Sequence, residues 1–378
     1  MLEKVAFKGF KALADVTIEL EALTVLVGAN GSGKTSVLKG IDLLGQAAEE
    51  AASSDDLRER LGRIVDLQNA ETRSWDQAES PSVSGRHQKL VLELLFLTAA
   101  IQLNHDDGTS HSLPSWSHLV YNNVPETLRR HLQPNSPFRR EFSPCVRLQL
   151  DPARLAEPSF LDASDEFPRL RHDGQGLASL VAYFLETRSE ALEQIEAGLR
   201  AVVPHMRRLR VVPTPVTRQE KEILRINNEA LIREVKHTYR GHRLEVEVEG
   251  QGYVPAHELS DGTLITLGLF AALLGPQRPK ILLLDDIDRG LHPAAQRVLV
   301  ERLREIQKRV QIVCTSHSPY FLDALRPEEV RVMKLDRQRH AHCRRLTEHP
   351  EWESWKDSMT PGEFWSTVGE DWVFAEEE

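Results

Sequence analysis

The alternation of apolar and polar residues over the first forty positions predicts three short strands and one helix. The runs VAF, VTIEL and LTVLV alternate or cluster in the way that strands do. The third run leads directly into GANGSGKTS, and VLKGIDLLGQAA follows with apolar residues at helical spacing. The pattern therefore predicts a strand, a glycine-rich loop and a helix in direct succession.

Two later apolar runs predict buried parallel strands that end in polar residues. Residues 281–284 are four large aliphatic residues, and Asp285 and Asp286 follow them directly. Residues 310–314 form a second run, which the polar sequence TSHS follows. In α/β sheets, ligands bind at such strand ends, so we expect ligand-binding or catalytic side chains there.

The sequence LSDGT, residues 259–263, opens the apolar run LITLGLFAALL, which predicts a buried helix. Ser260 and Asp261 are good N-capping residues, and the glycine lets the chain turn. By itself the motif is explained as a helix start. The alternative is that it forms half of a site whose other half lies elsewhere.

Composition indicates an ordinary folded protein. The chain has 378 residues, of which 40% are hydrophobic and 28% charged. We expect no membrane association, because no apolar stretch is long enough to span a bilayer and MLEKVAFKGF does not look like a signal peptide. The three cysteines are widely spaced without a CxxC pair, which favours a cytoplasmic protein and argues against a zinc site.

The net charge of −10 argues against a protein that coats nucleic acid by charge alone. Two local basic clusters leave a nucleic-acid partner open, as either solvated faces or grooves that track phosphates. The clusters are Arg207, Arg208, Arg210, Arg218, Lys221, Arg225, Arg233, Lys236, Arg240 and Arg243, and then Arg129, Arg130, Arg139 and Arg140.

The glycine-rich loop has the GxxxxGK[ST] pattern, in the strand–loop–helix context that a nucleotide-binding P-loop requires. Its backbone N–H groups and the helix N-terminus would face the phosphates. Lys34 would reach the β- and γ-phosphates, and the Thr35 hydroxyl would bind Mg²⁺. The predicted cofactors are ATP and Mg²⁺. The predicted nucleotide-binding residues here are Asn30, Gly31, Ser32, Gly33, Lys34, Thr35 and Ser36.

A magnesium nucleotide needs a second anchor, and the acids after residues 281–284 supply it. Asp285 would hold the metal together with Thr35, as a Walker B carboxylate does. Asp286 would stand beside the γ-phosphate, where it could orient or deprotonate a water molecule. His317 could donate a hydrogen bond to a γ-phosphate oxygen. The predicted catalytic residues are therefore Lys34, Asp286 and His317.

The order of these motifs resembles that of ABC-type ATPases. The matching segments are KGFKAL, GANGSGKTS, HDGQGLASLVAYFL, LSDGT, LLLDDIDRGLHP and TSHSPYFLDALRPEEV. Within that class the chain looks like the RecF, SMC and OLD group, and more closely like compact stand-alone AAA-family ATPases of bacterial defence and repair. The resemblance covers residues 1–45 and 150–337. It implies an α/β P-loop NTPase fold: an ABC-type ATPase head with a mixed β-sheet flanked by helices and an inserted helical/β region.

The resemblance also implies a head-to-head homodimer with two ATP molecules between the subunits. Ser260 and the backbone of Gly262 of one copy would then complete the nucleotide site of the other, which is built by Lys34, Thr35, Asp285, Asp286 and His317. LSDGT would thus be the second half of a shared site. Assemblies larger than a dimer stay open.

One position departs from the family pattern. The family usually has Glu after the Walker B Asp, and here Asp286 is one methylene shorter. Because a misplacement of about 1 Å can cost on the order of 10²-fold in rate, we expect slow hydrolysis, unless another group such as Asp288 places the water.

The expected organisation is an ATPase head over residues 1–340 and an acidic, tryptophan-rich tail over residues 341–378. The head would contain an insertion at 46–145 and a helical lobe with the signature region at 170–275. Trp352, Trp355, Trp365 and Trp372 lie among acidic residues of the tail. They either pack on their own domain or dock on a basic pocket of a partner.

Long heptad repeats of the SMC type are absent from the sequence, and only about sixty residues follow the SHSP motif, where OLD proteins carry a nuclease domain. We therefore expect an ATPase whose ATP-dependent dimer regulates a separate effector, such as a nuclease or toxin of an anti-phage defence system. The alternative is a RecF-like, ATP-gated DNA clamp in DNA repair.

Overall fold

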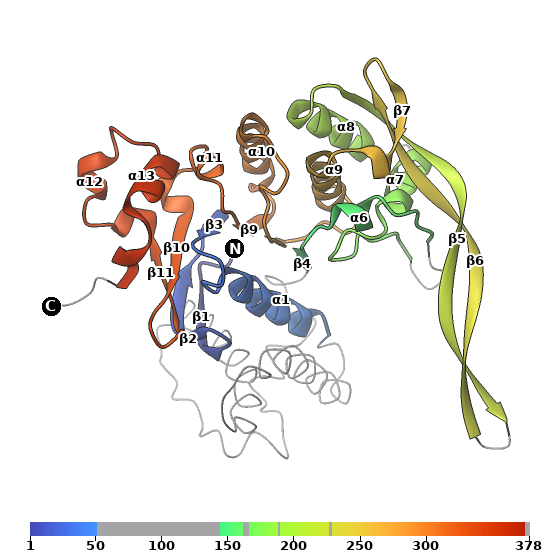
Figure 1. The fold of residues 1–378 in the computed structure, drawn as a ribbon, viewed down its shortest axis with the longest axis horizontal. Helices are drawn as coiled ribbons and strands as arrows, with labels where there is room; N and C mark the ends of the chain where they lie inside the picture. The colour runs from blue at the N-terminus through green and yellow to red at the C-terminus, as the bar shows by residue number, and fades with distance from the viewer. Residues whose placement is uncertain (51–143, 162–165, 188–189, 227–228, 375–378) are drawn as a thin grey trace. The chain divides into compact units, whose positions relative to one another are not determined.

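The computed structural model describes residues 1–50, 144–161, 166–187, 190–226 and 229–374 (Figure 1). The chain divides into two compact units. Unit 1 comprises Met1–Arg147, Pro279–Ile287 and Leu303–Glu378, and unit 2 comprises Leu148–Arg278 and Asp288–Arg302. Most of the expected 46–145 insertion, with its arginine cluster at 129–140, lies outside the described residues.

Unit 1 is built on a mixed six-stranded sheet with the strand order β11-β10-β3-β9-β8-β4. β3 pairs in parallel with both β10 and β9, β9 pairs in parallel with β8, and β11 runs antiparallel to β10. The expected α/β fold with a mixed sheet is confirmed. The strands are β3 (Leu23–Val27), β4 (Cys145–Leu148), β8 (Ile281–Leu284), β9 (Gln311–Thr315), β10 (Val330–Leu335) and β11 (Ala341–Arg345).

The central strands are apolar at nearly every position because both faces of this sheet are covered. All residues of β3, β8 and β9 are buried. The hairpin of β1 (Lys4–Phe10) and β2 (Leu13–Glu19) and the helix α1 (Lys34–Glu50) share a hydrophobic core with the sheet. A Cβ atom on Gly40 would lie 2.4 Å from the Phe7 ring, so α1 rests directly on that ring.

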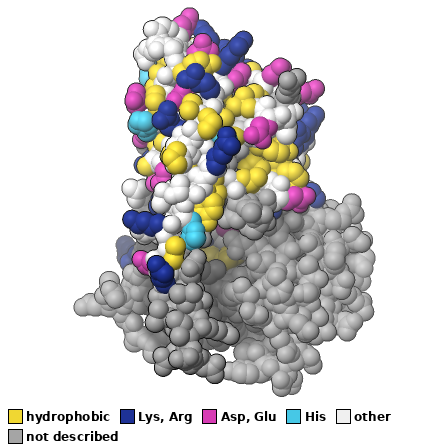
Figure 2. All heavy atoms as spheres, turned by 90° about the vertical axis from the view of Figure 1, so that its right-hand side faces the viewer, with side chains coloured by type: hydrophobic (Ala, Val, Ile, Leu, Met, Phe, Trp, Pro, Cys, Tyr) yellow, Lys and Arg dark blue, Asp and Glu magenta, His cyan; other side chains and the backbone are white. Residues whose placement is uncertain are grey.

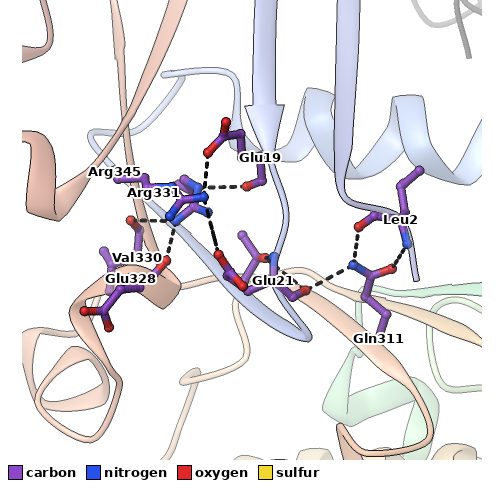
Figure 3. Close-up of polar contacts among 9 residues, drawn as sticks. Leu2, Glu19, Glu21, Gln311, Glu328, Val330, Arg331 and Arg345 are labelled. Carbon is purple, nitrogen blue, oxygen red and sulfur yellow. Dashed lines mark hydrogen bonds and ion pairs between the residues drawn. The ribbon is translucent and has the colours of Figure 1, made fainter. Parts of the chain in front are cut away.

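Two buried polar side chains tie the N-terminal segment of unit 1 to the sheet (Figure 3). The Gln311 amide accepts a hydrogen bond from the Leu2 N–H at 2.8 Å and donates to the Leu2 carbonyl at 2.7 Å. The Arg331 side chain is only 1% exposed, and its Nε donates to the Glu19 carbonyl at 2.8 Å. Strands β9 and β10 are thereby joined to the first twenty residues.

The C-terminal elements pack within unit 1 as short helices. They are α11 (Pro319–Leu322), η3 (Pro327–Glu329), η4 (Leu346–Glu348), α12 (Trp352–Trp355), α13 (Pro361–Val368) and η5 (Asp371–Phe374). Trp352 and Trp372 are buried, and Phe364 lies edge-on to Trp352 at 5.1 Å. Trp355 stays 42% exposed. Most of the tail therefore follows the self-packing interpretation.

Unit 2 combines helices with a long two-stranded ribbon, which extends away from these helices (Figure 1). The helices are α6 (Pro152–Leu155), α7 (Leu177–Glu186), α8 (Glu190–Val202), η2 (Ala256–Glu258), α9 (Asp261–Leu273) and the start of α10 (Pro293–Ile306). The ribbon pairs β5 (Met206–Ile226) antiparallel with β6 (Glu229–Val248), and β7 (Gly252–Pro255) adds a short third strand.

Residues 170–275, where we expected a helical lobe with the signature region, contain this ribbon as well as the helices α7, α8 and α9. The local sequence LEVEV at 244–248 alternates as strands do. Leu244, Val246 and Val248 are accordingly buried on one face at the base of the ribbon. Within the part of the chain that the structure describes, every helix is too short or too polar to cross a membrane.

Candidate nucleotide site

The glycine-rich loop connects the end of β3 to the start of α1, as the sequence predicts. Gly28 has a φ of +147°, and a Cβ atom there would lie 2.2 Å from the carbonyl oxygen of Met333 in β10. Only glycine therefore allows the loop to leave β3 so close to the neighbouring strand. At the loop tip, Asn30 and Gly31 are exposed, whereas Ser36 lies half-buried in the first turn of α1.

Lys34 lies across this loop. Its ammonium donates to the carbonyls of Gly28 at 2.8 Å and Ala29 at 2.9 Å, and contacts the Ser32 hydroxyl at 3.4 Å. Burial lowers the pKa of Lys34, and the charges of Asp286, Glu370 and Asp285 oppose that shift. A buried cation whose hydrogen bonds go to neutral oxygens is well suited to a phosphate, which would supply full negative charge.

Thr35 and Asp285 meet at the end of β8. The Thr35 hydroxyl donates to Asp285 Oδ1 at 3.1 Å, and the Thr315 hydroxyl donates to the same oxygen at 2.8 Å. The other oxygen, Asp285 Oδ2, is buried without a hydrogen-bond partner. A buried carboxylate oxygen without a partner, beside a threonine hydroxyl, is an appropriate donor set for Mg²⁺. The residues present therefore fit the metal that the family uses.

Asp286 occupies a turn directly after β8. Its φ of +52° lies in the left-handed region, which aspartate tolerates better than most residues. Its N–H donates to the Thr315 hydroxyl at 2.8 Å. Its carboxylate Oδ1 lies 3.9 Å from His317 Nε2, and the two side chains are 51% and 40% exposed. Both groups could therefore reach a ligand from solvent.

Ser260 and Gly262 lie in unit 2. Ser260 is the N-cap of α9: its hydroxyl accepts a hydrogen bond from the Thr263 N–H at 3.3 Å, which confirms the helix-start interpretation. Ser260 is also exposed, whereas Gly262 is buried. Completion of a shared site by these residues stays a prediction.

Unit 1 thus brings five of the predicted residues to the ends of β3, β8 and β9: Lys34, Thr35, Asp285, Asp286 and His317. The sequence analysis missed the role of Thr315, which contacts both acids. The only signal in the sequence was a hydroxyl directly after an apolar strand.

A P-loop, a Walker B acid with an unpaired oxygen and a following histidine define an ATPase site of the P-loop class. Residues 117–323 match the family described as "AAA domain, putative AbiEii toxin, Type IV TA system", and residues 1–94 match "AAA ATPase domain". Because the first match covers more than half of the sequence, the chain belongs to that AAA-domain family.

The OLD nuclease of Thermus scotoductus is 25% identical over 360 residues, which cover 89% of this chain and 62% of that protein. The chain therefore spans less than two thirds of the length of this relative. The relative and the family together confirm the resemblance to the RecF, SMC and OLD group of ATPases.

Two solved structures of SMC heads match this chain over most of its length, at low identity. A head bound to the C-winged helix domain of ScpA covers 90% of this chain and 96% of its own, with 16% identity and a TM-score of 0.46. The SMC head domain from Thermotoga maritima covers 91% of this chain and 98% of its own, with 12% identity and a TM-score of 0.39.

Proposed function

We propose that this ATPase closes as a head-to-head homodimer around two ATP molecules, and that closure regulates a separate effector protein. The observation that carries the proposal is that both halves of such a site are open to solvent. Asp286 and His317 are 51% and 40% exposed beside the P-loop, and Ser260 is exposed at the N-terminus of α9. Groups that contact a γ-phosphate from only one side leave room for donors from a second copy.

The N-terminus of α9 has the chemistry for that role. The Ser260 hydroxyl, the Gly262 N–H and the positive end of the helix dipole would face the γ-phosphate held by the other copy. ADP lacks this phosphate, so hydrolysis would remove the bridge between copies. ATP binding then favours the dimer, and hydrolysis releases it.

The chemistry follows from the residues of unit 1. Lys34 and the loop N–H groups bind the β- and γ-phosphates, while Thr35 and Asp285 would hold Mg²⁺, which neutralises charge on the phosphate oxygens. Asp286 orients a water molecule and accepts its proton. The water oxygen bonds to the γ-phosphorus as the bond to the β–γ bridging oxygen breaks, which gives ADP and inorganic phosphate. His317 donates a hydrogen bond to a γ-phosphate oxygen, and Asp286 then returns its proton to solvent.

The family description names a putative toxin and the relative is called a nuclease, which supports an effector of one of these two kinds. We propose that it acts in anti-phage defence. The proposal places the effector chemistry on a separate protein, whose activity the ATP-bound dimer holds or triggers.

Light scattering in ADP and in ATP tests the dimer. We expect the mass of the wild type to double in ATP, Asp286→Asn to stay dimeric, and Ser260→Arg to stay monomeric. The control is Ser354→Arg, which adds the same charge at an exposed position of α12 and should dimerise normally. A Ser260→Arg variant that dimerises and hydrolyses ATP like the wild type would refute the shared site.

The effector is tested by co-expression with the product of the neighbouring gene. Its nuclease or toxin activity should differ between ATP and ADP, and Asp286→Asn should hold it in the ATP-dependent state. An activity that ignores nucleotide and the Asp286→Asn change would contradict regulation by this ATPase.

The ribbon supports the second candidate function, the ATP-gated DNA clamp. Arg218, Arg233, Lys236 and Arg240 are exposed on its outer part, and so is the acid Glu234. A two-stranded ribbon also fits the major groove of DNA.

The ion pairs at the base of the ribbon argue against the clamp. Arg207 pairs with Glu249, and Arg243 pairs with Glu245 at 2.7 Å. Hydrogen bonds from Arg210 and Arg243 hold the pKa of Glu245 below its usual value. Figure 2 views the molecule from the right-hand side of Figure 1. On the described part of that side, basic and acidic side chains are interspersed among hydrophobic ones and do not form a continuous basic surface.

The clamp function is tested by measuring the binding of a labelled DNA duplex in the presence of ATP, over a range of salt concentrations. For a clamp, the double variant Lys236→Ala and Arg240→Ala should reduce the salt slope by about one for each phosphate that is no longer neutralised. Arg207→Ala is the control, because its charge is already paired with Glu249. No ATP-dependent binding at low salt would exclude the clamp.

A further inference from the structure

We propose that Thr315 is a positioning residue that fixes both acids after β8: it reserves one oxygen of Asp285 for a divalent cation and holds the turn that carries Asp286. The inference rests on the proposed ATP hydrolysis at this site. Thr315 is the last residue of β9, which pairs in parallel with β8, and its side chain is 0% exposed.

Three consecutive residues bond to this one threonine. Its hydroxyl donates to Asp285 Oδ1 at 2.8 Å and accepts from the Asp286 N–H at 2.8 Å. Its carbonyl accepts from the Ile287 N–H at 3.2 Å. The segment that leaves β8 is therefore attached to the end of β9 at each step.

The hydroxyl carries only one proton, and the geometry assigns it. Asp285 Oδ1 is 2.8 Å away, whereas Asp286 Oδ1 is 3.4 Å away, so the proton goes to Asp285. Because Thr35 also donates to Oδ1, at 3.1 Å, that oxygen receives two hydrogen bonds and the buried Oδ2 receives none. A buried carboxylate oxygen is costly without a partner. The arrangement therefore leaves Oδ2 for a cation.

Thr315 also holds the turn that carries Asp286, through its hydroxyl and its carbonyl. A left-handed backbone is unfavourable for an L-residue, and Asp286 adopts it with a φ of +52°. The hydrogen bonds from Asp286 and Ile287 to Thr315 offset that cost. The reach of the Asp286 carboxylate is thus set by a turn that Thr315 holds in place.

A threonine at a strand end could instead serve only the packing of the sheet, and Thr24 provides the comparison. Thr24 is also 0% exposed, in the adjacent strand β3, and its hydroxyl accepts from the Glu21 N–H at 2.8 Å. It bonds neither acid. Thr24→Val therefore removes a buried hydroxyl from the same sheet without changing the contacts of Asp285 or Asp286.

The test compares Thr315→Val, Thr315→Ser and Thr24→Val with the wild type. A fluorescent ATP analogue is titrated with and without Mg²⁺, and kcat and KM are measured for ATP. For Thr315→Val we expect the half-saturating Mg²⁺ concentration to rise about 10- to 100-fold and kcat to fall on the order of 10²-fold. Nucleotide binding in EDTA and KM should stay within about twofold of the wild type, because the substitution leaves Lys34 and the P-loop unchanged.

Thr315→Ser keeps the hydroxyl and should restore both the Mg²⁺ dependence and kcat, while Thr24→Val should resemble the wild type. The proposal is overturned if Thr315→Val keeps the wild-type Mg²⁺ dependence, if Thr24→Val is impaired to the same degree, or if Thr315→Ser fails as Val does. A wild type that neither binds nor hydrolyses ATP would refute the proposed function instead. Mg²⁺ binding measured by calorimetry would then still test the positioning role of Thr315, since Thr315→Val should weaken Mg²⁺ binding and Thr315→Ser should not.

Discussion

The carbonyl oxygen of Gly290 lies 2.4 Å from the point where a Cβ atom on Gly262 would sit. Both glycines belong to unit 2, so the signature helix α9 begins in direct contact with the segment that follows the Walker B acids. Gly262 is required here for close approach of two backbones, since its φ is not in the left-handed region.

Gly262→Ala should therefore destabilise the start of α9. Forcing the two backbones apart should lower the free energy of unfolding by about 1–3 kcal/mol, measured by denaturant titration. Gly275→Ala, two residues after the end of the same helix, would place its Cβ atom 3.2 Å from the nearest atom and should change stability by less than about 0.5 kcal/mol. Equal destabilisation by the two variants would mean that the contact with Gly290 is unimportant.

Arg331 should be a major contributor to the stability of unit 1. It is 1% exposed and bonds the carbonyls of Glu19 at 2.8 Å and Glu328 at 2.5 Å (Figure 3). Arg331→Met would remove the donor from two part-buried carbonyls and a buried charge from the sheet, and should lower the free energy of unfolding by about 3 kcal/mol. Arg345→Met removes a more exposed partner of Glu19 and should cost at most about 1 kcal/mol. Thermal and denaturant unfolding of both variants checks the difference.

His349 should make the stability of unit 1 depend on pH. Its ring lies 5.0 Å from both Phe364 and Trp372, and burial lowers its pKa, with Glu351 opposing the shift. Because the unfolded chain binds the proton more readily, this contribution is complete above the unfolded pKa of about 6.5 and is lost as the pH falls through the lower folded value.

Unfolding of the wild type and of His349→Gln between about pH 8 and pH 5 isolates this residue, since other groups cancel in the difference. The wild type should lose more stability than the variant on acidification. A constant difference between the two proteins over this range would show that His349 does not contribute.

Asp286→Glu should not restore a faster ATPase. Glutamate bears the left-handed backbone at this position less well than aspartate, so the free energy of unfolding should fall by up to about 1 kcal/mol. The turn also positions the backbone for the shorter aspartate side chain, so the carboxylate of glutamate would lie beyond the place that the aspartate carboxylate occupies. We expect kcat at or below the wild-type value in a phosphate-release assay, and Asp286→Asn as the inactive control. A clear increase in kcat would show that the short acid, and not the turn, limits the rate.

The local parts of the site were accessible from the sequence. The P-loop, the strand before Asp285 and the helix after Ser260 each follow from periodicity and residue type within about a dozen positions. The structure has all three as expected, in β3 and α1, β8, and α9.

The missing parts depend on which strands become neighbours. Thr315 contacts Asp285 only because β9 lies beside β8, and Arg331 is buried only because β10 lies near the end of β2. Neither of these two neighbour relations leaves a pattern in the local sequence. The left-handed turn at Asp286 is likewise set by bonds to Thr315, which is twenty-nine positions later in the chain.

The order of strands in the sheet also constrains how the protein can be made. The P-loop follows β3, whose two neighbours are β9 and β10, and Leu23 pairs with Ile312. During synthesis β3 leaves the ribosome long before its partners β9 and β10, so it stays unpaired until residue 311 and those after it have been made. A truncated product that ends before residue 311 would retain the GANGSGKTS motif but neither strand that flanks it. Loss of the last fifth of the chain should therefore yield an aggregation-prone fragment rather than a weaker ATPase.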